Sequence, residues 1–135
     1  MMTASDYVKT YAVKHKIHVF KQGRYPTCSD VKGRIVLINV SEIPKKIMPF
    51  SIAHEIGHII HKDNGKLYNS APCNGALFEE SATVFAIQML YSYCKHYKVS
   101  FDDASDFMTK LGIPQQHSYL VEVLLQGYNI LIVWK

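Results

Sequence analysis

The sequence lacks the features of several classes of protein. It has no apolar run of the roughly 18 residues that a membrane helix requires, and no apolar core of a secretory signal at its start. Its three cysteines include no C-x-x-C pair, which argues against a zinc ribbon or a thioredoxin-type site. Glycine-rich phosphate-binding motifs are missing as well. These absences predict a cytoplasmic protein with no membrane partner and no nucleotide cofactor.

Size and composition indicate a globular protein. A chain of 135 residues, of which 48% are apolar and 19% charged, can bury a core without disulfide bonds. The net charge of +4 is mild and spread along the chain, which predicts no direct contact with nucleic acid. We therefore expect one domain over residues 1–135. Its core would span residues 33–96, and a helical C-terminal part would span residues 100–135.

Hydrophobic periodicity predicts an α+β fold that is mostly helical and has a small sheet. The strongest strand, Arg34–Val40, is apolar and β-branched, and we expect it at the edge of the sheet, where it would pair with an extended substrate. Ser100 and Asp103 look like a capping pair. Helices are expected over residues 3–15, 49–63, 76–96, 100–112 and 115–125, strands over 17–20 and 34–40, loops over 21–32 and 66–75, and a last strand or docked tail over 130–134.

The most informative string is His-Glu-Ile-Gly-His at residues 54–58. It matches H-E-x-x-H and falls on the helix expected to begin near Pro49. His54 and His58 lie one turn apart on one face, so both imidazoles can reach one metal ion at about 2.0–2.1 Å. Glu55 points about 100° away and can reach a water instead. The alternative is an exposed helix face, but the isoleucines around the motif indicate a buried helix, whose polar groups need partners.

A third ligand has to come from elsewhere in the chain. The metzincin pattern would place a histidine at position 64, which is Asn64. His61 shares the histidine face but lies roughly 7 Å along the helix axis, which suits a donor to the site better than a ligand. The next helix offers Glu79 or Glu80. Glu79 is mildly favoured, because small residues on its face would let the two helices approach closely.

Residues 51–61, together with Glu79-Glu-Ser-Ala-Thr-Val-Phe-Ala at residues 79–86, resemble the ImmA/IrrE family of metallopeptidases. The family pattern is H-E-[L/I]-G-H with a histidine three residues later, then E-x-x-A-[N/D]-x-F-A. Thr83 stands where Asn or Asp is usual. The resemblance covers residues 33–89 and implies a zincin-like domain, zinc ligands His54, His58 and Glu79, and Glu55 as the catalytic base.

The resemblance also implies a function, namely zinc-dependent cleavage of a peptide bond in a protein. The implied substrate is a helix-turn-helix repressor encoded by a phage or mobile element, so the protein would be an anti-repressor. The alternatives are an anti-repressor that contains zinc but acts by contact alone, and a component of a toxin–antitoxin pair. A DNA-binding role is disfavoured because residues 100–125 carry a single lysine against four acidic residues.

Peptide hydrolysis needs a donor for the developing oxyanion. The sequence offers His61, Tyr68, His117 and Tyr119 and selects none of them. Two imidazoles and a carboxylate suit Zn²⁺, although cobalt, manganese and nickel accept the same ligands. Zn²⁺ is therefore the expected cofactor.

Overall fold

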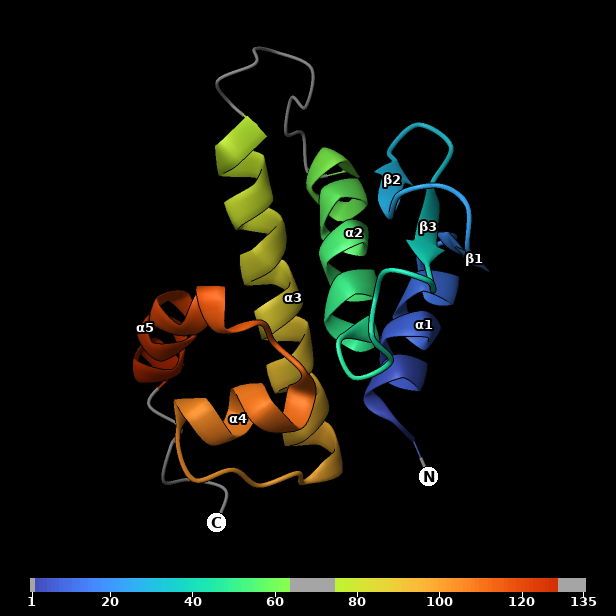
Figure 1. The fold of residues 1–135 in the computed structure, drawn as a ribbon. Coiled ribbons are helices and arrows are strands. Elements are labelled where there is room, and N and C mark those ends of the chain that lie inside the picture. Colours follow the sequence, from blue (N-terminus) through green and yellow to red (C-terminus); the bar gives the residue numbers. More distant parts are fainter. Residues whose placement is uncertain (1, 64–74, 129–135) are drawn as a thin grey trace.

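The computed structural model describes residues 2–63 and 75–128 (Figure 1). As predicted, the chain is α+β, with several helices and a small sheet. Its elements are α1 (Ala4–Lys14), β1 (His18–Gln22), β2 (Cys28–Asp30), β3 (Ile35–Asn39), α2 (Met48–Asp63), α3 (Gly75–Tyr97), α4 (Ala104–Leu111), the 3-10 helix η2 (Gln115–His117) and α5 (Ser118–Tyr128). Tyr68 and the tail expected over residues 130–134 lie outside the described residues. Among the described helices, none combines the length and apolar character needed to cross a membrane.

The expectation that residues 34–40 form an edge strand is wrong. β3 is the central strand of three, parallel to β1 on one side and antiparallel to β2 on the other. Its continuous apolar sequence is typical of a strand covered on both faces, and Val36 and Ile38 are completely buried. Residues 35–39 of β3 pair with β1 and residues 35–37 pair with β2, so the strand does not lie at the edge of the sheet. β2 was missed because it is three residues long and follows Gly23 and Pro26, which indicate a turn.

Helix α2 runs through the middle of the molecule, between the sheet and α3 (Figure 1). It begins at Met48, one residue before the expected Pro49. Ile52, Ile56 and Ile59 are completely buried, as the apolar spacing predicted. They belong to a hydrophobic core to which all five α-helices and β3 contribute. The helix that carries the motif is therefore held on several sides.

Helices α2 and α3 cross at very short range. A Cβ atom built on Gly57 would lie 3.1 Å from Ala82 Cα and 3.2 Å from Phe85 Cβ. Ala82 and Ala86 are completely buried at this crossing. Glycine and alanine thus let the backbones approach closely enough for side chains of both helices to meet.

We expect Gly57→Leu to lower the free energy of unfolding by about 1–3 kcal/mol, because the added side chain overpacks the crossing. The matched control is Gly127→Leu in α5, where a Cβ would meet nothing within 4 Å. There the substitution gains roughly 0.5–1 kcal/mol of helix propensity. Urea unfolding of both variants measures the difference. Equal stability of the two variants would contradict the close crossing.

The C-terminal helices differ from the expectation at one cap. The capping pair was expected to start at Ser100, but Asp103 is the N-cap of α4 and accepts a hydrogen bond of 2.8 Å from the Asp106 N–H. Ser100 lies outside the helix, and its carbonyl accepts a hydrogen bond from Lys110 Nζ at 2.7 Å. Gly112 ends α4 with a φ of 69°, as predicted for a glycine terminator.

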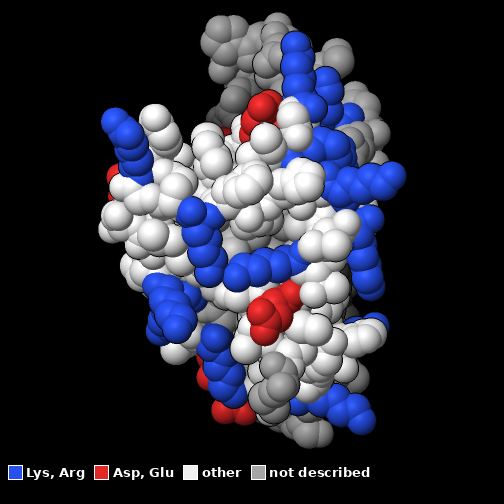
Figure 2. Space-filling view, turned by 90° about the vertical axis from the view of Figure 1, so that its right-hand side faces the viewer, with Lys and Arg blue, Asp and Glu red and all other residues white. Residues whose placement is uncertain are grey.

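Positive charge gathers on the face that carries α1 and the sheet, where Lys and Arg side chains dominate (Figure 2). Residues 1–46 contain nine of the 15 Lys and Arg residues but three of the 11 Asp and Glu residues. The charge is therefore less evenly spread than the mild net value suggested. The carboxylates of the motif and of the start of α3 lie outside this basic segment.

Candidate metal centre

The two motif histidines lie together on α2. The ring centroids of His54 and His58 are 5.1 Å apart, and the rings are almost perpendicular, at 83°. His58 is buried and His54 is half-buried. One helical turn between them brings both Nε2 atoms to the side of α2 that faces α3.

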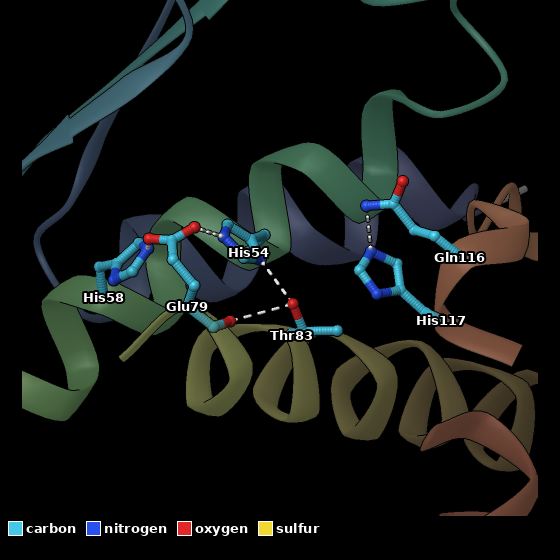
Figure 3. A network of polar contacts seen from close by, with 6 residues as sticks. All are labelled: His54, His58, Glu79, Thr83, Gln116 and His117. Carbon is cyan, nitrogen blue, oxygen red and sulfur yellow. Dashed lines mark hydrogen bonds and ion pairs between the residues drawn. The ribbon is translucent and has the colours of Figure 1, made fainter. Parts of the chain in front are cut away.

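Glu79 of α3 reaches both histidines (Figure 3). Its Oε2 lies 2.7 Å from His58 Nε2, and its Oε1 lies 3.0 Å from His54 Nε2. One ligand atom from each of the three residues lies within 4.8 Å of the others. Glu80 belongs to the same cavity but not to this cluster. The structure thus brings together the two histidines and Glu79, the glutamate that was favoured because small residues share its helix face.

The cluster fits a metal ion in donor chemistry. Three ligands placed tetrahedrally at about 2.0–2.1 Å from zinc stand about 3.3 Å apart. The nitrogen–oxygen distances of 2.7 and 3.0 Å involve two different oxygens of Glu79, and the three ligand atoms lie within 4.8 Å of one another. The Glu79 side chain is 63% exposed, so it has room to adjust toward the spacing that a metal would require. Burial lowers the pKa of His58, with the Glu79 carboxylate opposing that shift, and this favours the neutral imidazole that binds metals.

Thr83 holds the far side of the His54 ring, a role that the sequence did not reveal. Its hydroxyl donates to the Glu79 carbonyl oxygen at 3.0 Å, one turn back along α3. The same oxygen lies 3.2 Å from His54 Nδ1 and can therefore accept its N–H. A proton on Nδ1 leaves the Nε2 lone pair pointing into the cluster. Thr83 thereby orients His54.

We expect Thr83→Val to weaken zinc binding by about 10- to 100-fold, since it removes the hydroxyl that orients His54 while keeping the side-chain shape. Thr83→Ser, which keeps the hydroxyl, is the matched control and should bind zinc within a few-fold of the wild type. Competition with a chromophoric chelator measures both affinities. An unchanged affinity in the valine variant would show that Thr83 does not position the ring.

Glu55 projects from α2 beside this cluster and lines the same cavity. Burial raises the pKa of its carboxyl, opposed by nearby His54 and by a hydrogen bond from the Ser29 side chain of β2. Ser29 was missed because its segment was expected to be a loop. A carboxylate whose pKa is raised is a stronger base than an exposed glutamate.

The cavity measures about 770 Å³ and is bounded by α2, the start of α3 and the segment from Pro114 to Leu120. Of the four donor candidates, His117 and Tyr119 line it. His61 instead packs edge-on against Phe85, with ring centroids 6.0 Å apart. Tyr68 lies outside the described residues. Burial lowers the pKa of His117, and nearby His54 lowers it further, which favours a neutral ring.

Comparisons with known proteins give no further guide to this site. Neither a protein-family model, nor a curated protein, nor a solved structure matches this chain. Its function therefore has to be argued from the geometry of its own residues.

Proposed function

We propose that this chain is a zinc-dependent metallo-endopeptidase that hydrolyses a peptide bond in a protein. One observation carries the proposal. Two imidazoles from α2 and a carboxylate from α3 converge, and a second, half-buried carboxylate lies beside them in an open cavity. Three protein ligands with a neighbouring general base are the requirements of a hydrolytic zinc site.

His54, His58 and Glu79 are the residues that would hold the zinc ion. Zinc, when bound, polarises a carbonyl group and lowers the pKa of a water molecule to about 7. Three protein ligands leave a fourth position for substrate or water, which separates a catalytic site from a closed structural one. His54 and Glu79 both line the cavity, so a substrate bound there would lie beside these two residues.

Glu55 acts in this proposal as the general base. It accepts a proton from the attacking water and passes it to the leaving amine. Its partial burial supports the first step, since the raised pKa makes the carboxylate a stronger base. The Ser29 hydroxyl holds the carboxylate toward β2.

Two side chains of the C-terminal segment are candidates to donate a hydrogen bond to the oxyanion. His117 is half-buried in the cavity, whereas the Tyr119 side chain is 78% exposed. A neutral His117 ring keeps one N–H donor. We propose that His117 fills this role, since a donor acts best where water is excluded.

The substrate follows from the resemblance to ImmA/IrrE metallopeptidases, which we propose as the family of this chain, with a zincin-like fold and a cytoplasmic location. The substrate would then be a helix-turn-helix repressor of a phage or mobile element. A metal-containing anti-repressor or toxin–antitoxin component that acts by contact is the alternative.

The test is to purify the protein, measure its bound metal by elemental analysis, and incubate it with the repressor encoded beside its gene. We expect close to one zinc per chain and cleavage that a chelator abolishes. Zinc with repressor binding but no cleavage would support the contact-only alternative. Absence of any bound or bindable metal would refute the proposed site.

A further inference from the structure

The cavity at the proposed zinc site has an apolar half that the hydrolytic chemistry does not use. Its polar lining beside the proposed zinc site includes His54, Glu55 and Glu79. The apolar half is built by the chain leading into α2, by the first turn of α2, and by the η2–α5 segment. Its walls are Ile43, Ile47, Phe50, Pro114 and Leu120.

This apolar half begins directly beside the metal ligands. Phe50 lies one turn before His54 on α2, and their ring centroids are 6.1 Å apart. Successive Cα atoms of a peptide are 3.8 Å apart. A peptide whose scissile bond lies over His54 can therefore reach Phe50 with the side chain of an adjacent residue.

The far wall comes from a part of the chain distant in sequence. The His117 ring also packs against Phe50, with ring centroids 5.2 Å apart. Leu120 follows one turn later, at the start of α5, and is half-buried. The C-terminal helices therefore close a pocket over the active helix as well as covering the core.

The charges of the cavity limit the side chain that it accepts. Three carboxylates line it, from Glu55, Glu79 and Glu80, whereas no Lys or Arg is among the described residues that do so. An acidic substrate side chain would be repelled, and a short polar one would leave the apolar walls in water. Burying a leucine or phenylalanine side chain removes those walls from water.

We propose that this apolar half is a specificity pocket that binds a bulky apolar side chain next to the scissile bond. The proposal rests on the zinc peptidase function proposed above and adds a substrate preference to it. A cavity of about 770 Å³ holds such a side chain together with the flanking backbone. Filling an apolar pocket in this way changes binding by roughly 10- to 100-fold.

The pocket can be tested without a known substrate or any turnover. Leucine hydroxamate and glycine hydroxamate carry the same metal-binding group and amine and differ in one apolar side chain. Isothermal titration of each into the zinc-loaded full-length protein should show about tenfold or tighter binding of the leucine compound. Equal affinities would overturn the pocket and leave the metal site standing. Failure of the protein to bind zinc would instead overturn the proposed function, and the pocket with it.

Substitutions on the two walls of the pocket would show which residues produce the leucine preference. Leu120→Ala should reduce the leucine preference at least several-fold while glycine hydroxamate binding stays the same. Leu124→Ala is the matched control, because Leu124 is half-buried on the same helix but does not line the cavity. Ile43→Ala probes the opposite wall should the first variant fold poorly. A preference that survives both wall substitutions would contradict the assignment.

Discussion

Glu55→Gln is expected to keep its zinc and lose its peptidase activity. Glutamine has nearly the shape of glutamate but cannot accept the proton of the attacking water. Loss of a general base lowers rates by about 100- to 10,000-fold. Glu55 is not one of the three clustered ligand residues, so the zinc content should match that of the wild type. Cleavage of the repressor and elemental analysis of the same preparation measure the two quantities.

The neighbouring carboxylates provide an internal control. Glu80 lines the same cavity as Glu55 and lies outside the ligand cluster, so Glu80→Gln should cleave within a few-fold of the wild type. The Ser29 hydroxyl can donate to glutamine as it does to glutamate, which keeps the side chain in place. If Glu55→Gln cleaved the repressor as fast as Glu80→Gln, Glu55 would not be the general base. Loss of zinc from Glu55→Gln would show that it acts on the metal site instead.

The helices were predictable from the sequence because their signals are local. Apolar spacing and terminating residues place α2 and α3 within one residue of their observed starts. The sheet was harder to predict from the sequence. Whether the segment around β3 lies at the centre or the edge depends on which strands pair with it, and β2 is too short to show a pattern of its own. Strand order is set by tertiary contacts that one sequence does not display.

The same distinction applies to the site. His54 and His58 could be paired from the sequence because one helix fixes their separation. Glu79 could be favoured over Glu80 because the small residues beside it predicted a close crossing, and Gly57 opposite Ala82 is the contact that permits it. The contact between Thr83 and His54 could not be predicted, because it depends on the distance between two helices.

Zinc should stabilise the wild type strongly and Glu79→Ala hardly at all. Zinc at about 100 times its dissociation constant adds about 2.7 kcal/mol to the free energy of unfolding. In a chain of this length that raises Tm by about 10 °C. Removing Glu79 leaves two of the three ligands. The dissociation constant for zinc should then rise far above the zinc concentration used. Thermal unfolding with a chelator and with zinc measures both shifts.

The exposure of Glu79 makes this experiment specific for the metal. Its side chain is 63% exposed, so its removal should leave the Tm of the zinc-free protein within a few degrees. A general defect in folding would lower Tm in both conditions, whereas loss of a ligand removes the zinc-dependent rise alone. Glu80→Ala, the adjacent residue, should keep the full rise. An equal rise in Tm in Glu79→Ala and the wild type would mean that zinc binds elsewhere on the chain and that Glu79 is not one of its ligands.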